Sequence, residues 1–465
     1  MTRDAALALA ATTFDSGAFR DKLAEMIAIP STSQDPAFAP DVQRYLGATI
    51  QPWMERLGFT VEIHPNPIEG FGPILTAIRM EDPALPTILA YGHGDTVRGL
   101  DDQWDEGLSP WVLTEVGDRW YGRGTADNKG QHAALISGLE TVLATRGKLG
   151  FNVKMLLEVS EERGSVGLRP FVQAHADLLA ADVLIGSDGP KVGPSIPTIT
   201  TGSRGAFRFD LVLRTRPGGV HSGNWGGMTT DPAIVMAHAI ASIADRHGRI
   251  LVPGLLPPHG LPNSVRDVLT GCELQSEESA TINPEWGEPG LSSAEKVFGW
   301  TSFIVLAMLS GKPESPVNAV APDARAVCQL RYTVDCDPET FTATIRKHLD
   351  DAGFPEITIE NAGTGGFGAS RTDPTNPWVQ RVKASMENTL GKRVQIVPNG
   401  GGGLPGDMMV EFLGVPLVWI PLSYNGCKQH GPNEHFLVPA AREGLIAYTG
   451  LWWDLGDQSS RQLSS

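Results

Sequence analysis

Hydrophobic and polar positions follow two different periods along the first 200 residues. Apolar side chains recur at helical spacing in Phe19–Ile27 and Val42–Leu57, and Pro30 ends the first of these helices. Short runs rich in Val, Ile and Leu follow at Pro86–Tyr91, Val153–Val159 and Val183–Gly186. Such runs are typical of strands buried on both faces of a mixed or parallel sheet. With helices between them, such as Gly130–Thr145, they predict an α/β layer.

The pattern changes near Gly202 and changes back near Asn376. Between these points the sequence predicts a smaller α+β unit, with strands Phe207–Arg214, Ala324–Val334 and Ile357–Glu360 and helices Asp231–Asp245 and Pro338–Ala352. The Pro- and Gly-rich tract Leu251–Ser315 is expected to form loops with short helices. A helix at Trp378–Leu390 and a strand at Val415–Ile420 resume the α/β pattern. We therefore expect one domain from residues 1–202 and 367–465, with residues 203–366 inserted as a second domain.

Composition narrows the class of protein. The 465 residues are 41% hydrophobic and 19% charged, as in a globular protein, and the net charge of −16 argues against nucleic acid or an anionic membrane as a partner. The four cysteines include no Cys-x-x-Cys pair, which fits a reducing compartment. The apolar stretch Ala5–Ala11 lies beside Asp4 and is interpreted as the start of a helix, not a signal peptide. No apolar run approaches the roughly 20 residues that span a bilayer. These features predict a cytoplasmic protein.

Polar residues with metal-binding chemistry follow three of the predicted strands. His93 and Asp95 follow the first, Glu161 and Glu162 the second, and Asp188 the third. In open α/β sheets, the carboxyl ends of the strands form the edge where ligands bind. Several carboxylates in one cleft are costly unless cations neutralise them. Imidazole and carboxylate donors suit zinc, and also cobalt or manganese.

Each of these residues also has a simpler interpretation. A histidine beside a strand is commonly structural, and Glu161-Glu162 resembles a solvated loop. Asp127, at the end of Tyr121–Asp127, fits the N-cap of the helix that follows. The joint arrangement at strand ends favours the metal site over these separate explanations.

The motifs resemble those of a known family, the dinuclear zinc aminoacylase/carboxypeptidase G2 metallohydrolases, and most closely its carnosinase-like dipeptidase branch. They occur in the family's order along nearly the whole chain: His93-Gly94-Asp95, Gly122–Gly130, Glu161–Ser165, Asp188, Gly202–Gly205 and His430–Glu434. The resemblance implies a zinc-exopeptidase-like catalytic domain, a central mixed sheet flanked by helices, with an inserted α+β lid and dimerisation domain. It also implies a homodimer formed through that inserted domain.

The resemblance implies a role for each matched residue. Asp127 would bridge two divalent ions and precede a cis peptide bond to Asn128. His93 and Asp188 would complete the ligands of one ion, and Glu162 and His430 those of the other. Asp95 would orient His93. Glu161 would be the general base that takes a proton from a metal-bridging water.

Further residues are matched to substrate and transition-state binding. His221 resembles a family histidine that stabilises the oxyanion, often from a partner subunit, and a histidine in a flexible turn is the alternative. Arg331 resembles an arginine that holds a substrate carboxylate, although a structural salt bridge is nearly as good an explanation. Asn318, in the preceding Asn318–Pro322 segment, is carried over as substrate-binding. Gly402 and Gly403 belong to the glycine-rich loop Gly401–Pro405, which is expected to line the substrate cleft.

Two departures from the dipeptidase branch leave the substrate open. Asn128 stands where that branch usually has a second acidic residue, and Tyr424–Gln429 is unlike the dipeptidases. The prediction is hydrolysis of a dipeptide or short peptide. The alternatives are removal of an acyl group from an N-acyl amino acid, attack on another small amide or amine, and, more remotely, an inactive metal-binding relative. His132 and His435 lie near the motifs and are predicted to be helix or loop residues.

Overall fold

The computed structural model describes residues 2–274, 281–364 and 366–457. Its larger part is built on an eight-stranded mixed sheet. In spatial order, the strands are β1 (Thr60–His64), β2 (Ile74–Arg79), β6 (Asn152–Glu158), β3 (Thr87–His93), β7 (Val183–Gly186), β19 (Leu417–Trp419), β9 (Thr198–Thr200) and β18 (Gln395–Val397). The predicted mixed α/β fold is therefore confirmed. β1 and β2 were not predicted, and they extend the sheet beyond β6.

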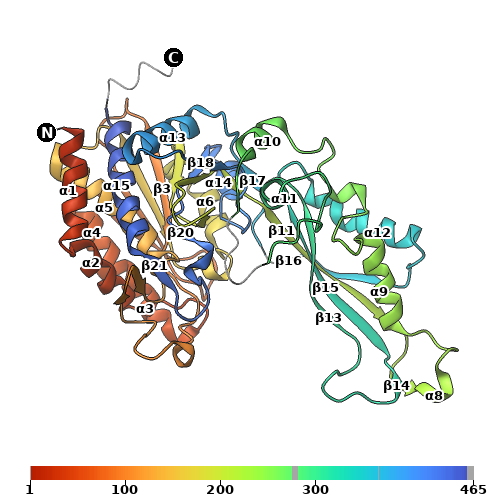
Figure 1. The fold of residues 1–465 in the computed structure, drawn as a ribbon. Helices are drawn as coiled ribbons and strands as arrows, with labels where there is room; N and C mark the ends of the chain where they lie inside the picture. The colour runs from red at the N-terminus through yellow and green to blue at the C-terminus, as the bar shows by residue number, and fades with distance from the viewer. Residues whose placement is uncertain (1, 275–280, 365, 458–465) are drawn as a thin grey trace.

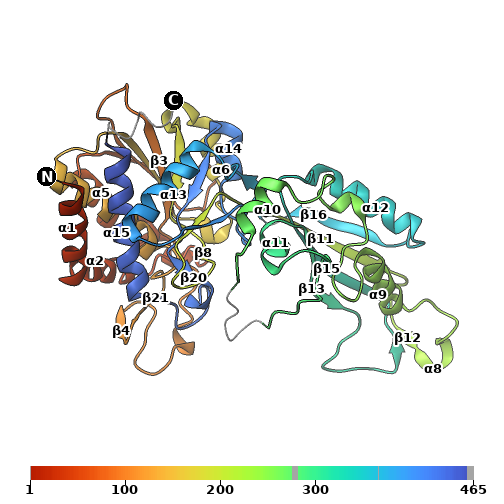
Figure 2. The ribbon, with the colours of Figure 1, turned by 45° about the horizontal axis from the view of Figure 1, so that its top comes forward.

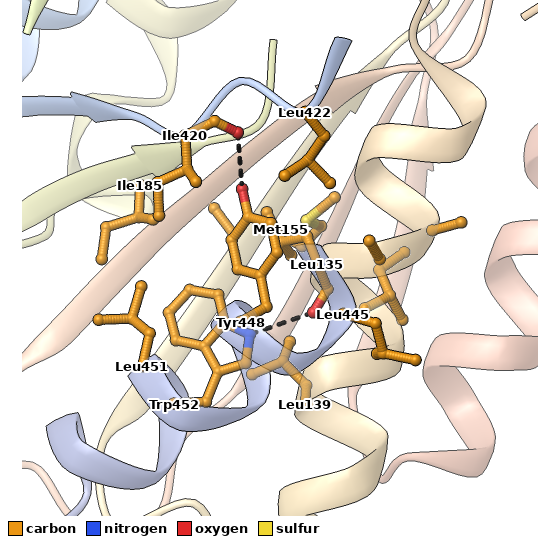
Figure 3. Close-up of a cluster of buried hydrophobic side chains, with 14 of the residues drawn as sticks. Leu135, Leu139, Met155, Ile185, Ile420, Leu422, Leu445, Tyr448, Leu451 and Trp452 are labelled. Carbon is orange, nitrogen blue, oxygen red and sulfur yellow. Dashed lines mark hydrogen bonds between the residues drawn. The ribbon is translucent and has the colours of Figure 1, made fainter. Parts of the chain in front are cut away.

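Successive residues of the central strands face opposite sides of the sheet, and both sides are buried. Ile88 and Ala90 of β3 pack into a large core with helices α1, α2, α5, α13 and α15, whereas Leu89 and Tyr91 pack into a second core with α6 and α14. This two-sided burial explains why these strands are continuous apolar runs. Figure 3 shows part of the larger core, where Trp452 Nε1 donates a hydrogen bond to the carbonyl of Leu135 at 3.1 Å.

The helices pack against the main sheet or belong to the inserted segment. Their bounds are α1 (Arg3–Asp15), α2 (Ala18–Ile27), α3 (Ala39–Arg44), α4 (Gln51–Arg56), α5 (Lys129–Arg146), α6 (Leu168–Ala174), α7 (Ala176–Leu179), α8 (Ser222–Trp225), α9 (Pro232–Ile243), α10 (Asn263–Leu269), α11 (Ser293–Phe298), α12 (Phe341–Asp351), α13 (Pro377–Leu390), α14 (Asp407–Leu413) and α15 (Val438–Leu455). The single helix expected over Val42–Leu57 is instead α3 and α4 joined by a π-helical stretch, Tyr45–Ile50.

The inserted segment carries a separate antiparallel sheet of four strands. Their order is β13 (Ser302–Leu309), β15 (Asp323–Tyr332), β11 (Gly205–Arg214) and β16 (Thr358–Thr364). Helices α9 and α12 cover one face of this sheet, with their own buried core. β13 lies within the tract expected to form loops, so that part of the prediction was wrong. The domain limits at residues 202/203 and 366/367 stay a prediction.

Short strand pairs complete the structure. They are β10 (Gly202–Ser203) with β17 (Ser370–Arg371), β12 (Val220–His221) with β14 (Ala319–Val320), β8 (Pro190–Lys191) with β20 (Ser423–Tyr424), and β4 (Thr114–Val116), β5 (Arg119–Tyr121) and β21 (His435–Leu437) together. The C-terminal tail Gly456–Ser465, which the sequence predicts to be frayed, lies mostly outside the described residues. Within the described part of the chain, no helix combines the length and apolar character needed to cross a bilayer.

Candidate metal centre

Three central strands bring the predicted polar residues to one edge of the main sheet. β3 pairs in parallel with β6 on one side and with β7 on the other. His93 is the last residue of β3, Glu161 and Glu162 follow β6, and Asp188 follows β7. Asp127 precedes α5, the long buried helix that packs behind the sheet. Parallel strands end at the same edge, and these side chains therefore converge as expected.

His93, Asp127 and Asp188 form a first group that could hold a metal ion. One nitrogen or oxygen from each lies within 4.8 Å of the others. The Nε2 atom of His93 is 3.0 Å from Oδ1 of Asp127 and 3.7 Å from Oδ2 of Asp188. All three side chains are buried. The group therefore offers one imidazole and two carboxylates.

Asp127, Glu162 and His430 form a second group of the same kind. The Nε2 atom of His430 is 3.2 Å from Oδ2 of Asp127 and 3.2 Å from Oε2 of Glu162. Asp127 thus directs one carboxylate oxygen into each group. The peptide bond from Asp127 to Asn128 is cis. The two groups share Asp127 and contain the five residues predicted as ligands.

Asp95 connects His93 to the loop that carries Glu161 and Glu162. Its Oδ1 atom lies 3.4 Å from Nδ1 of His93. Its two carboxylate oxygens accept hydrogen bonds from the backbone N–H groups of Glu161 and Glu162, both at 3.1 Å. The hydroxyl of Ser33 donates a further hydrogen bond to Asp95 at 2.6 Å. Asp95 therefore orients one candidate ligand and holds the backbone of another.

Burial and like charges make Glu161, Glu162 and Asp188 reluctant to ionise, whereas hydrogen bonds from His430 and His93 lower the pKa of Asp127 despite its burial. Burial raises the pKa of Glu162 to about 7 and that of Asp188 to about 6. Burial also raises the pKa of Glu161 well above its ordinary value, with the neighbouring carboxylates adding to the effect. Hydrogen bonds that His430 donates to the carboxylates of Asp127 and Glu162 raise the pKa of His430 to about 11. The cluster therefore favours bound positive charge.

The donor set fits divalent cations on two further grounds. Oε1 of Glu162 is buried and has no hydrogen-bond partner among the described residues, although its companion oxygen contacts His430. An unpaired buried carboxylate oxygen is costly, and a cation would pair it. In addition, each group combines imidazole with carboxylate, which are donors that Zn²⁺ accepts.

Glu434 supports the loop of Asp127 and was not singled out from the sequence. Its Oε1 atom accepts hydrogen bonds from the backbone N–H groups of Gly124, Ala126 and Asp127 at 2.9–3.0 Å. Its Oε2 atom accepts a hydrogen bond from Arg123 at 2.7 Å, and both side chains are at most 1% exposed. The sequence offered one signal for this role: Glu434 is a charged residue four positions after His430, within a motif otherwise assigned to the metal.

His132 and His435 have structural partners. The ring of His132 contacts the hydroxyl of Tyr45 at 2.6 Å and Oδ1 of Asn128 at 3.0 Å, and burial lowers its pKa well below the ordinary value. The ring of His435 contacts the hydroxyl of Tyr424 at 2.9 Å. Neither histidine belongs to a candidate metal group among the described residues.

A cavity of about 650 Å³ opens onto the two groups. Asp127, Glu161, Asp188 and His430 line it, as do Gly402 and Gly403 of the glycine-rich loop. Gln429, also in the lining, donates a hydrogen bond to Oδ2 of Asp127 at 3.3 Å. The predicted base, three of the five candidate ligands and the glycine-rich loop thus line one common cavity.

His221, Asn318 and Arg331 do not lie with the metal groups of their own chain. His221 and Asn318 are exposed, and the backbone carbonyl of Asn318 accepts a hydrogen bond from the N–H of Ser222 at 2.9 Å. β12, β14 and α8, which surround them, lie at the end of the molecule farthest from β3 (Figures 1 and 2). Arg331, on β15, is absent from the described lining of the cavity. The sequence could not reveal this separation because it depends on how the inserted sheet extends.

A second arginine, Arg204, contacts the glycine-rich loop and lies near enough to Arg331 to feel its charge. Arg204 is 8% exposed, and its guanidinium donates hydrogen bonds to the carbonyl of Gly401 at 3.3 Å and to the hydroxyl of Ser302 at 3.2 Å. Burial, and then the positive charge of Arg331, lower its pKa to about 10. Within the described chain, neither arginine forms a salt bridge with a carboxylate.

Comparison with known proteins agrees with this geometry. Residues 89–454 match peptidase family M20/M25/M40. The chain is 33% identical to human Beta-Ala-His dipeptidase, over 90% of this chain and 86% of that protein. It is 29% identical to Cysteinylglycine-S-conjugate dipeptidase of Corynebacterium striatum, over 83% of each chain.

Solved structures share the fold. Human carnosine dipeptidase 1 superposes with a TM-score of 0.77 at 23% identity, covering 97% of this chain and 98% of that one. The metallo-carboxypeptidase Sso-CP2 of Sulfolobus solfataricus gives 0.78 at 24% identity, covering 94% and 99%. The mixed sheet, the two groups joined at Asp127 and the extent of the match lead to one conclusion: this chain is a metallopeptidase of peptidase family M20/M25/M40.

Proposed function

We propose that the protein is a dipeptidase that binds two divalent ions and hydrolyses the peptide bond with Glu161 as general base. The observation that carries this proposal is that Asp127 directs one oxygen to each of two ligand groups, beside the cavity that Glu161 also lines. The names of the human and C. striatum relatives support a dipeptide as the substrate.

His93, Asp127 and Asp188 would hold one ion, and Asp127, Glu162 and His430 the other. We propose Zn²⁺ in both positions, with Co²⁺ or Mn²⁺ as substitutes that accept the same donors. When bound, the two ions would polarise the scissile carbonyl and lower the pKa of a water molecule.

Glu161 supplies the proton transfer. Glu161 lines the cavity, and Asp95 fixes its backbone, so the base could take a proton from the attacking water and return it to the leaving amine. Burial and neighbouring carboxylates raise its pKa well above the ordinary value of a glutamate. Asp95 also holds His93 in one orientation.

A second copy of the chain would complete the site. His221 and Asn318 are remote from the metal groups of their own chain, and we propose that they serve the active site of a partner in a homodimer. The edge strand β13 supports this arrangement because Leu306, Met308 and Leu309 are 45–57% exposed on it. An exposed apolar edge strand is a pairing surface. His221 would then stabilise the oxyanion.

Arg331 is proposed to hold the substrate carboxylate, with Gly402 and Gly403 binding substrate oxygens through their backbone N–H groups. Arg204 adds a second positive charge behind the glycine-rich loop. The cytoplasmic location, the absence of nucleic-acid and membrane partners and the division into a catalytic domain and an inserted lid remain predictions from the sequence.

A hydrolysis screen tests the proposed reaction. Metal-reconstituted protein would be given free dipeptides and matched N-acyl amino acids in parallel. Cleavage of dipeptides is expected. Cleavage of the acyl compounds alone would identify a deacylase and contradict the proposed substrate class.

A further inference from the structure

A small helical unit in the inserted segment is attached to the larger sheet. It comprises α10 and α11, which contact each other; α10 also contacts β18. Both helices lie apart from α8 (Figure 2). Gln395 of β18 donates a hydrogen bond to the carbonyl of Val268 at 2.7 Å, and Asn399 donates one to the carbonyl of Phe298 at 2.7 Å. Val268 also packs against the main core. The unit is therefore held in position relative to the metal groups.

The α10–α11 unit is internally braced. Glu295 of α11 accepts a hydrogen bond from Arg266 of α10 at 2.8 Å and one from the backbone N–H of Ser292 at 2.7 Å. A small core of Leu261, Val265, Leu269 and Ala294 lies between the helices. Side chains on such a supported element keep a defined position.

The last two residues of α11, Val297 and Phe298, line the cavity of the metal groups. Val297 lies beside the glycine-rich loop: a Cβ atom on Gly401 would lie 3.4 Å from its Cγ1, at ordinary van der Waals distance. Three apolar residues of the larger unit, Val192, Val397 and Leu404, line the same cavity and are 2–7% exposed. The cavity thus has an apolar wall as well as the wall of carboxylates and imidazole.

We propose that Val297 and Phe298, with Val192, Val397 and Leu404, form a subsite for an apolar aliphatic side chain of the substrate. This inference rests on the proposed dipeptidase function and specifies its substrate class. A polar side chain placed against this wall would lose water without gaining a hydrogen bond, whereas an aliphatic one would bury apolar surface.

Four matched dipeptides test the subsite: Gly-Gly, Leu-Gly, Gly-Leu and Leu-Leu. In the metal-reconstituted enzyme, leucine in at least one position is expected to raise kcat/KM by about 10- to 200-fold over glycine. Phe298→Ala and Val297→Thr are each expected to lower this ratio by about threefold to tenfold. Leu291→Ala is the matched control because Leu291 packs in the same unit but is absent from the described cavity lining. It should leave the ratio unchanged.

Two results would overturn the subsite: equal kcat/KM for Gly-Gly and all leucine peptides, or a ratio that survives both substitutions at the wall. If no dipeptide is cleaved, the proposed dipeptidase function is wrong. The subsite can then still be tested by measuring the affinity of the enzyme for the same peptides. Calorimetry on metal-loaded Glu161→Gln protein should still show tighter binding of leucine peptides, with the preference reduced in the Glu161→Gln, Phe298→Ala double variant. Equal affinities for leucine and glycine peptides would contradict the subsite on this measure.

Discussion

The carboxylate of Glu434 accepts a hydrogen bond from the backbone N–H of Asp127 at 3.0 Å. The residue that reaches both ligand groups is therefore positioned by a buried acid from the C-terminal part of the chain. Glu434 also binds the N–H groups of Gly124 and Ala126 and the guanidinium of Arg123. The side chain of Glu434 thus holds in place the segment of chain that leads to Asp127.

Replacing Glu434 by Ala should destabilise the protein strongly. The change leaves Arg123 as a buried, unpaired cation, for which a loss of about 3–5 kcal/mol in the free energy of unfolding is expected. Denaturant unfolding of the metal-free protein measures this directly. Glu360→Ala, which breaks the exposed ion pair with Arg214, is the matched control and should have little effect. Equal small effects would show that Glu434 is not a structural support.

Single ligand substitutions should remove single ions. Asp188→Ala belongs to one group and Glu162→Ala to the other, so each is expected to lower the metal content from two ions per chain to one. Asp127→Ala affects both groups and should bring the metal content toward zero. Asp95→Asn should keep both ions but weaken binding by roughly 10- to 100-fold, because Asp95 acts through His93. Metal analysis after dialysis is the measurement. Two ions retained in Asp127→Ala would contradict the shared ligand.

The free energy of unfolding of the metal-free protein should depend on pH because buried Glu158 ionises. Burial raises its folded-state pKa from 4.5 to about 7, so the stability it contributes is present below pH 4.5 and is lost as pH rises through 7. Glu158→Gln keeps an oxygen that can accept from Tyr91 and Ser165 but cannot ionise. Between pH 5 and pH 8, the variant should gain about 2–3 kcal/mol relative to the wild type. Urea unfolding at both pH values checks this, and a constant difference would refute the assignment.

Mixing two inactive variants should restore activity if His221 acts across a dimer. Glu161→Gln lacks the base and His221→Ala lacks the oxyanion donor, and each is expected to be inactive alone. A heterodimer combines the intact Glu161 of one chain with the intact His221 of the other, so co-expression should yield about a quarter of wild-type specific activity. The proportion of heterodimer is measured with two affinity tags. Inactive heterodimers would show that His221 does not act in this way.

The sequence could predict the parts of the site that follow strands. His93, Glu161, Glu162 and Asp188 each lie within three residues of the end of an apolar run, and parallel pairing places the ends of these runs together. Asp127 and His430 lie outside such runs, and only the resemblance to a known family placed them with the others. Glu434 was missed because a buried acid and an exposed one look alike in a single sequence.

The fold was least predictable where tertiary contacts decide the structure. β13 lies in a Pro- and Gly-rich tract, and most of its side chains are exposed, so it lacks the alternation of a half-buried strand. Pairing with β15 makes it a strand. The α10–α11 unit shows the same limit: it belongs by sequence to the inserted segment, but Gln395 and Asn399 fasten it to the larger sheet.

The central claim is that Glu161 acts as the base beside two ions that it does not hold. Glu161→Gln tests it in one experiment, with metal content and dipeptide turnover measured on the same preparation. Two ions per chain and a turnover reduced by about 100-fold or more are predicted, because general-base catalysis contributes that much. Unchanged turnover with both ions in place would contradict the account.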